Sequence, residues 1–308
     1  MSKATPFGSR STADRVLAGV DLTRKRMVVT ECSSSIGFAT MKALSANGAR
    51  VIGLARTMGD ANAACAAAGR SLIPLECNAT DLSSVDAAVQ SIREVGPLDA
   101  VIINSPELQC FAEHAAQFAL VNRLAELVRR GTGRIVIGSN DNANITGARA
   151  KDVLFANFQG ARIYDSYAFD GHAALARALF AKELSRRLEV AGVLVNAFHS
   201  GAAVNLKWPE APRIARELIQ SVAGYFTKSP ARRAATPALL AASPVVVGTT
   251  GEYWSNCQIS RGNPLFSDLG LAKQLWEVSA QVIALAPGRS DFLEAARFSG
   301  DSPCSRTR

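Results

Sequence analysis

Three stretches of the sequence carry side chains that can exchange protons or orient a substrate. Asp170 and His172 stand near the start of a long helical pattern, and Glu113 stands on another, otherwise apolar, helical segment. Ser139 and Asn140 follow a short apolar strand pattern and add hydrogen-bonding groups. Apolar surroundings raise the pKa of a carboxyl group, which then can act as acid and base near neutral pH. These residue types predict acid–base chemistry.

The elements that must position these residues alternate along the chain. Apolar periodicity predicts strands at Met27–Thr30, Arg50–Ala55, Leu72–Cys77, Ala100–Ile103, Arg134–Ile137 and Val193–Phe198. Between them it predicts helices at Ile36–Ala46, Asp60–Ala68, Ser83–Val95, Cys110–Arg130 and Ser166–Val190. Strands that are apolar on both faces, each followed by a helix, are typical of a parallel sheet covered on both sides. The sequence therefore predicts an α/β fold: a single doubly wound, Rossmann-type parallel sheet with helices on both faces.

Neither a repeat nor a linker divides the 308 residues. We therefore expect one domain over residues 11–286. The ends differ in composition, and we expect flexible tails at residues 1–10 and 287–308. Ligands of a doubly wound sheet bind at the carboxyl ends of its strands, so the site is expected at that edge.

Composition excludes several classes of protein. With 48% hydrophobic and 19% charged residues, the chain is expected to fold rather than stay disordered. It has no apolar run of about 20 residues and no signal-peptide pattern, so we expect a cytoplasmic protein with no membrane partner. The 34 Lys and Arg residues exceed the 26 Asp and Glu residues, giving a net charge of +8. The basic residues are scattered and form no nucleic-acid-binding signature, so no nucleic-acid partner is expected.

The six cysteines show no CxxC pair and no metal-ligand spacing. Several of them lie within apolar strand or helix patterns. We therefore expect reduced, mostly buried thiols and no metal site.

Several segments resemble the short-chain dehydrogenase/reductase family, in its retinol-dehydrogenase-like branch. The most specific of them are Ser11–Leu22, Leu179–Leu188, Gly251–Cys257 and Ala272–Ser279. The resemblance runs from about Ser11 to Leu285, nearly the whole chain. It implies the Rossmann-type sheet named above, but it does not by itself assign the reaction.

The resemblance implies a dinucleotide loop of the form TGxxxGIG, where this chain reads Thr30–Gly37 as TECSSSIG. Only the last glycine of the motif remains, and Glu31 places a carboxylate where the cofactor phosphates would approach. The cofactor-binding residues carried over from the family are Ser34, Ile36, Gly37, Arg56, Asn78 and Asn104. Among these, Arg56 stands where the NADP-preferring branch binds the 2′-phosphate. We expect that no cofactor is required and that NADP(H) binding is weak or vestigial.

The catalytic positions implied by the family are replaced. An ungapped alignment through Leu179 places Asp170 at the catalytic tyrosine and Ala174 at the lysine that lowers the tyrosine pKa. Glu113 falls at the family's asparagine, and Asn140 at its serine with Ser139 one residue early. No YxxxK motif occurs nearby. Carbonyl reduction by the usual mechanism is therefore not expected.

We therefore expect a non-redox enzyme on a dehydrogenase fold, such as a cyclase or pericyclase, an isomerase or a dehydratase. Its substrate would be a bulky, apolar molecule resembling a secondary metabolite. Asp170 would be the acid and base, with Ser139, Asn140, Glu113 and His172 as further polar groups of the site. An atypical NADPH-dependent reductase and a non-catalytic pseudoenzyme that binds a metabolite or protein remain as alternatives. A homo-oligomer is expected through the long helix Ser166–Val190 and the C-terminal helices.

Overall fold

A single eight-stranded sheet forms the centre of the computed structural model, which describes residues 4–69, 71–79, 81–104, 111–139, 166–199 and 228–284. The strands are β1 (Arg26–Val29), β2 (Arg50–Ala55), β3 (Leu72–Glu76), β4 (Ala100–Ile103), β5 (Arg134–Ser139), β6 (Leu194–His199), β7 (Tyr253–Ser255) and β8 (Gln258–Ile259). Their order is β3-β2-β1-β4-β5-β6-β7-β8. Every neighbouring pair is parallel except β7 and β8, which are antiparallel. The predicted doubly wound sheet is confirmed.

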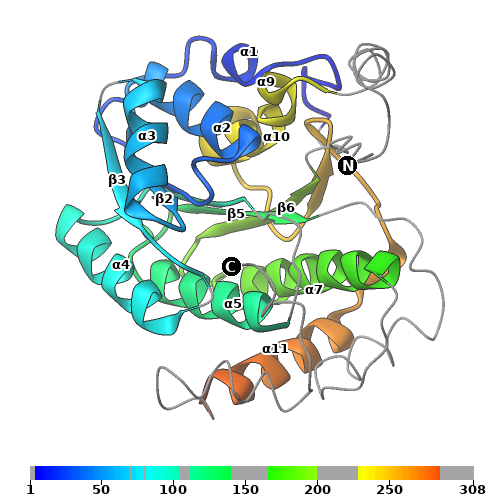
Figure 1. Ribbon diagram of the computed structural model, residues 1–308. Coiled ribbons are helices and arrows are strands. Elements are labelled where there is room, and N and C mark those ends of the chain that lie inside the picture. Colours follow the sequence, from blue (N-terminus) through cyan, green and yellow to red (C-terminus); the bar gives the residue numbers. More distant parts are fainter. Residues whose placement is uncertain are drawn as a thin grey trace, which may run out of the picture.

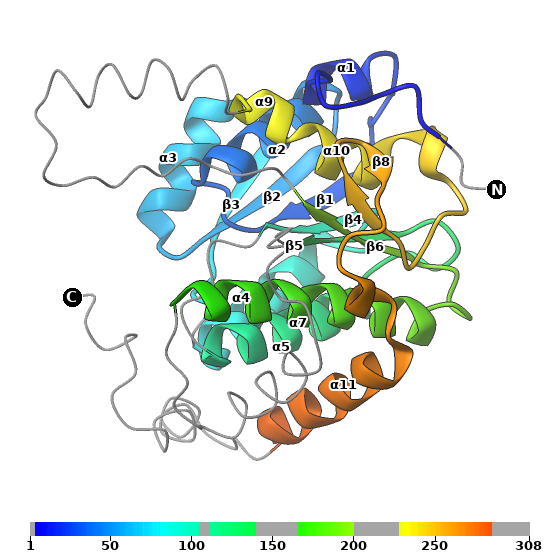
Figure 2. The ribbon, with the colours of Figure 1, turned by 90° about the vertical axis from the view of Figure 1, so that its right-hand side faces the viewer.

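Helices cover both faces of this sheet (Figures 1 and 2). On one face lie α1 (Ala13–Leu17), α2 (Ser35–Ala46), α3 (Met58–Ala68), α9 (Pro230–Arg233) and α10 (Ala235–Ala242). On the other lie α4 (Leu82–Val95), α5 (Phe111–Ala125) and α7 (Ser166–Arg187). The last helix, α11 (Leu269–Ala284), packs outside α5 and α7. Two short 3-10 turns, η1 (Pro244–Val246) and η2 (Pro264–Ser267), complete the C-terminal part.

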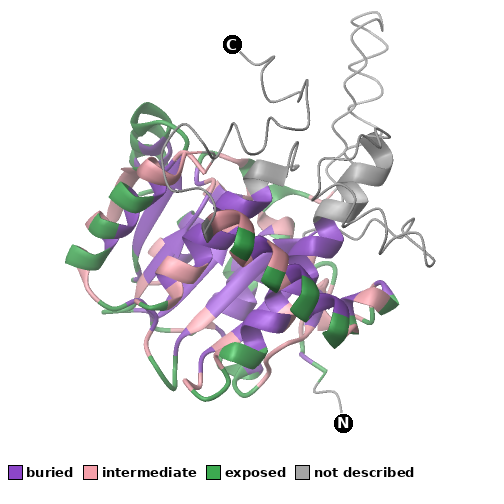
Figure 3. Ribbon diagram, turned by 90° about the horizontal axis from the view of Figure 1, so that it is seen from below, coloured by how far each residue is buried: buried purple, intermediate pink, exposed green. Residues whose placement is uncertain are grey.

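Alternation along the strands divides the apolar core into two layers. Met27 and Val29 of β1 pack with the helices α1, α2 and α10, whereas Val28 between them packs toward α4, α5 and α7. Strand residues that are apolar at every position can fill both layers at once, which explains the unbroken apolar runs. Figure 3 shows the buried sheet enclosed by helices whose outer faces are exposed.

Two helices end earlier than their apolar patterns predict. The helix predicted as Cys110–Arg130 stops at Ala125, because Leu98 takes up a parallel bridge with Val128. The long helix stops at Arg187, and the chain then turns through Gly192 at φ +66°. Glycine adopts this left-handed conformation without steric penalty.

The N-terminal segment is tied to the last hairpin. The Thr5 hydroxyl donates to the Cys257 carbonyl at 2.7 Å, and the Gln258 amide donates to the Thr5 carbonyl at 2.8 Å. Thr5 is buried as a result. The tail predicted at residues 1–10 is thus held in place around Thr5. The tail predicted at residues 287–308 lies outside the described residues.

Two short basic runs, Arg24–Arg26 and Arg129–Arg130, lie far apart in the sequence but come together at the amino-terminal edge of the sheet. The buried Asp99 carboxylate accepts from Lys25 Nζ at 3.1 Å and from the Arg26 backbone N–H at 2.9 Å. Arg129 Nε lies 3.4 Å from the same carboxylate. Part of the positive charge of both runs is therefore neutralised by a structural carboxylate.

Helix α11 covers part of the surface predicted to form a homo-oligomer. Trp276 of α11 stacks on Phe180 of α7 at a ring-centroid distance of 5.6 Å and meets Phe118 of α5 at 4.9 Å. The Arg187 guanidinium lies 4.2 Å from the centre of the Trp276 ring, a cation–π contact. This part of the long helix is occupied by its own chain, and a homo-oligomer stays a prediction.

Candidate functional site

The candidate site begins where the strand order reverses, between β1 and β4. Thr30 and Asn104 follow these two strands and bond reciprocally. The Thr30 hydroxyl donates to the Asn104 carbonyl at 3.0 Å, and Asn104 Nδ2 donates to the Thr30 carbonyl at 3.1 Å. Asn104 is 5% exposed, and within the described residues its Oδ1 has no hydrogen-bond partner. A buried acceptor without a partner is unfavourable, so this atom is available to a ligand at the switch point.

The loop between β1 and α2 keeps a tight turn although most of its expected glycines are missing. Glu31 adopts φ +51°, in the left-handed region where the motif would have glycine. Ser34 begins α2 as its N-cap, and its hydroxyl accepts from the Gly37 N–H at 3.1 Å. A Cβ on Gly37 would lie 2.0 Å from the Glu31 carbonyl oxygen, which no side chain tolerates. The one remaining glycine is therefore required by the packing of this loop.

The start of α2 offers backbone donors at this edge. Helix geometry leaves the N–H groups of Ser35 and Ile36 without an acceptor inside the helix. Together with the positive end of the helix dipole, such donors favour an anion. Ser34, Ile36 and Gly37 were predicted to bind a cofactor, and the fold places all three at this helix end.

Arg56 and Asn78 lie at the ends of the neighbouring strands. Arg56 follows β2 and is exposed, and Asn78 follows β3, where its backbone N–H donates to Ser84 Oγ at 2.9 Å. Because β1, β2 and β3 are adjacent and parallel, both residues share the edge that carries the α2 loop. The predicted cofactor-binding residues are thus distributed along one edge of the sheet.

Two thiols beneath this edge are protonated at neutral pH. Burial raises the pKa of Cys32 to about 12, with smaller contributions from Cys65 and the Glu31 carboxylate. Burial also raises the pKa of Cys77 to about 12, and Glu31 again adds to the shift. The same carboxylate therefore acts on the thiols that follow β1 and β3. Neither thiol is a nucleophile under these conditions.

Ser139 is the predicted catalytic residue whose side chain the structure places. It ends β5 opposite His199 of β6, is buried, and donates its hydroxyl to the Ala174 carbonyl of α7 at 2.8 Å. In this arrangement its proton is used on the helix backbone, so Ser139 can accept a further hydrogen bond but cannot donate one. Ala174, in the position implied for lysine, is 2% exposed.

The side chains of the other predicted catalytic residues lie outside the described part of the structure. Glu113 lies in α5, and Asp170 and His172 lie in α7. Asn140 lies outside the described residues altogether. Their catalytic roles remain predictions.

A buried polar contact that the sequence analysis did not identify joins α5 to α11. His114 is buried, and its Nε2 lies 3.2 Å from Ser279 Oγ, whose own hydroxyl donates to the Leu275 carbonyl at 2.8 Å. Burial, and secondly the positive charge of Arg177, lowers the pKa of His114 to about 3. This histidine is neutral and structural. Its partner is 165 residues away, so no local pattern reveals the pair.

The low pKa of His114 predicts a loss of stability in acid. An unfolded histidine titrates near pH 6.5, so as pH falls below that value the unfolded chain binds a proton that the folded chain does not. We expect this residue to remove roughly 3 kcal/mol of unfolding free energy between pH 7 and pH 4. Urea unfolding of His114→Gln should show a pH dependence weaker by that amount. Equal losses in both proteins would contradict the prediction.

Comparison with known proteins adds the following findings. A model of short chain dehydrogenases matches residues 25–126. Mouse retinol dehydrogenase 14 is 29% identical over 293 residues, with 85% of this chain and 86% of the relative covered. The Drosophila melanogaster WW domain-containing oxidoreductase is 27% identical, and the alignment covers 90% of this chain and 73% of that relative. Among solved structures, the L-sorbose reductase of Gluconobacter frateurii complexed with NADPH and L-sorbose has a TM-score of 0.60 at 19% identity. The superposition covers 78% of this chain and 97% of that chain.

These likenesses correct one prediction. The expectation that no cofactor is required is wrong, because the matching model and relatives are dehydrogenases and oxidoreductases, and the L-sorbose reductase structure holds NADPH. Glu31 and the missing glycines are therefore weaker evidence against a cofactor than the loop sequence indicates. The structure shows that the loop keeps its turn without them.

Proposed function

We infer that this chain is a member of the short-chain dehydrogenase/reductase family, in its retinol-dehydrogenase-like branch, and that it is an NADP(H)-dependent oxidoreductase of small molecules. The observation that carries this proposal is Asn104. Its buried Oδ1 lacks a partner among the described residues, at the switch point where doubly wound sheets bind ligands.

The residues at this edge fit a dinucleotide. Backbone donors at the start of α2 suit a pyrophosphate, the exposed Arg56 guanidinium suits a 2′-phosphate, and Asn104 Oδ1 can accept a hydrogen bond. Glu31 opposes the binding of phosphates through its charge. When bound, a nicotinamide would supply or accept the hydride.

The chain's own residues set the remaining chemistry. Ser139 holds β5 against α7 through the Ala174 carbonyl and can accept a hydrogen bond from a substrate hydroxyl. We propose that Asp170 exchanges the substrate proton, since its position in α7 is the one that the family gives to its acid. Glu113, Asn140 and His172 are proposed as further polar groups of the site.

The role of Arg56 gives a direct test. Arg56→Ala should weaken NADPH binding about tenfold and leave NADH binding unchanged, because only NADPH carries the 2′-phosphate that pairs with a guanidinium. Fluorescence titration of both cofactors measures the difference. Arg50→Ala is the matched control, because Arg50 is an exposed arginine at the opposite end of the same strand. Equal weakening of NADPH and NADH, or the same result for Arg50→Ala, would reject the assignment.

A second candidate function is non-redox turnover of a bulky apolar substrate by cyclisation, isomerisation or dehydration, with Asp170 as acid and base. This candidate is supported by the buried Ala174, which stands at the position that the family gives to lysine. An alanine has no positive charge to lower the pKa of a reductase's catalytic acid. Substrate conversion without a change in NADPH absorbance would distinguish it from reduction. NADPH binding without any turnover would instead favour the non-catalytic binding protein.

A cytoplasmic location also stays a prediction. Among the described residues, no helix has the length and apolar character needed to cross a membrane.

A further inference from the structure

A cavity of about 410 Å³ lies away from the cofactor edge, between α7, the start of β7 and the segment from β8 to η2. Its volume is within the range of small-molecule sites. Strands β5 and β6 separate β7 from β4, and the cavity adjoins Gly251 and Glu252, which precede β7. The cavity is therefore distinct from the edge that carries Asn104 and the α2 loop.

Small side chains leave this space open. Ala178 and Ala181 lie three residues apart on one face of α7, and Ala197 of β6 lies beside them in the lining. Larger residues at these positions would fill the space. The hollow is thus a consequence of alanines within a long helix, and its floor is apolar.

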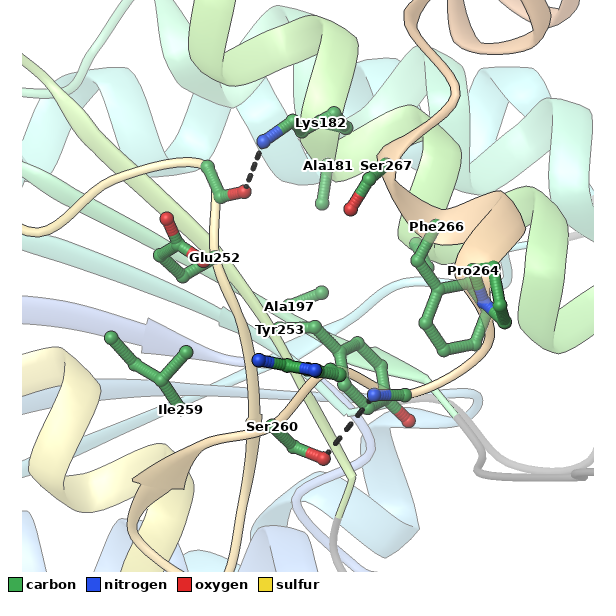
Figure 4. Close-up of a pocket in the computed structure, with 14 residues that line it drawn as sticks. Ala181, Lys182, Ala197, Glu252, Tyr253, Ile259, Ser260, Pro264, Phe266 and Ser267 are labelled. Atoms are coloured by element: carbon green, nitrogen blue, oxygen red, sulfur yellow. Dashed lines mark hydrogen bonds between the residues drawn. The ribbon is translucent and has the colours of Figure 1, made fainter. Parts of the chain in front are cut away.

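An aromatic pair forms the opposite wall. The rings of Tyr253 and Phe266 lie 4.5 Å apart between centroids, tilted by 37°. Gly262 passes close to both rings, since a Cβ on it would lie 2.7 Å from Phe266 Cδ2 and 3.0 Å from Tyr253 Cδ1. Figure 4 shows these rings across the hollow from Lys182. A flat apolar group would pack well against such a wall.

The polar lining has an excess of positive charge. Lys182 Nζ donates one of its three protons to the Gly251 carbonyl at 2.9 Å, which leaves two protons for a ligand. Arg261 and Glu252 also line the cavity, and no ion pair joins either of them to another described residue. Two cations against one carboxylate favour a ligand with a single negative charge, because a second negative charge would meet Glu252.

We propose that this cavity binds a small aromatic monocarboxylate. The ring lies against Tyr253 and Phe266, and the carboxylate accepts hydrogen bonds from Lys182 and Arg261. The size of the cavity suits a ring with a short acidic arm. The proposal is independent of the function inferred for the cofactor edge.

Phenylacetate is the probe for this proposal, with phenylacetamide as its neutral analogue of the same shape. Calorimetric titration of the full chain should show phenylacetate binding at least about tenfold more tightly than phenylacetamide, as expected for a charge-assisted contact. Arg261→Met, at an exposed position, and Lys182→Met should each reduce phenylacetate affinity by several-fold. Lys273→Met, on the exposed surface of α11, is the matched control and should have no effect. Saturating NADPH should not displace the probe.

Equal affinities for the two probes, no detectable phenylacetate binding, or unchanged affinity in Arg261→Met would each overturn the proposal. So would displacement by NADPH, because that result would place the probe at the cofactor edge. Thermal unfolding of Lys182→Met checks that loss of the Gly251 contact has not disrupted the fold. If Lys182→Met is destabilised, the phenylacetate affinity of Arg261→Met alone tests the proposal.

Discussion

Placing tyrosine at Asp170 and lysine at Ala174 in one chain is expected to raise NADPH-dependent aldehyde reduction about a hundredfold, the usual contribution of a positioned proton donor. The two positions are four residues apart in α7, so they lie on one face of the helix. A lysine near the phenol lowers the tyrosine pKa from about 10 toward neutrality, because the positive charge favours the phenolate. The gain requires both changes.

The control for this experiment is Asp170→Phe with Ala174→Lys, which has the same ring and cation but no hydroxyl. NADPH oxidation with a panel of apolar aldehydes measures activity, and its pH profile reports the new acid. Because Ala174 is buried, the melting temperature of each variant must be compared with that of the parent chain. Equal rates in the phenylalanine control and the tyrosine variant would show that proton transfer does not limit the reaction.

Replacing Glu31 with glycine should tighten NADPH binding about thirtyfold. The carboxylate stands in the loop before α2, and removing one repulsive charge near a phosphate is worth about 2 kcal/mol at a partly exposed site. Glycine also relieves a left-handed conformation that costs a non-glycine residue roughly 1 kcal/mol. This second effect stabilises the loop in the free and the bound protein alike, so the gain in affinity comes from the charge.

Glu31→Asn separates the two causes, because asparagine tolerates the left-handed conformation and is uncharged. If charge dominates, Glu31→Asn should reproduce most of the gain, and the gain should shrink as ionic strength rises. Glu189→Gln removes an exposed carboxylate from a distant turn and should leave NADPH affinity unchanged. An affinity within twofold of the parent for both Glu31 variants would contradict the repulsion.

The sequence predicts the sheet well because its signal is local. Val28 and its neighbours are apolar at every position, and a strand buried on both faces needs such a run. The same reasoning places Ser34, Arg56 and Asn104 at one edge of the sheet, since each directly follows a predicted strand or precedes a predicted helix, and the structure has them there. Their role in cofactor binding stays a prediction.

Features that depend on distant contacts could not be predicted from local patterns. The two-residue strand β8 is too short to show periodicity. The pairing of His114 with Ser279 requires α11 to fold over α5, which no pattern near His114 indicates. The error about the cofactor had a related cause: the loop sequence shows lost glycines, but not that Glu31 adopts the backbone conformation a glycine would have had.

The hydrogen bonds between Thr5 and the hairpin at Cys257–Gln258 affect the order in which the chain folds during its synthesis. Partners 252 and 253 residues apart can meet only after nearly the whole domain has left the ribosome. Until then the segment around Thr5 lacks these partners, although the strands β1 to β4 already have one another as neighbours. Docking of this segment is therefore a late step of folding, and a nascent chain stalled before residue 257 would still expose it to proteases.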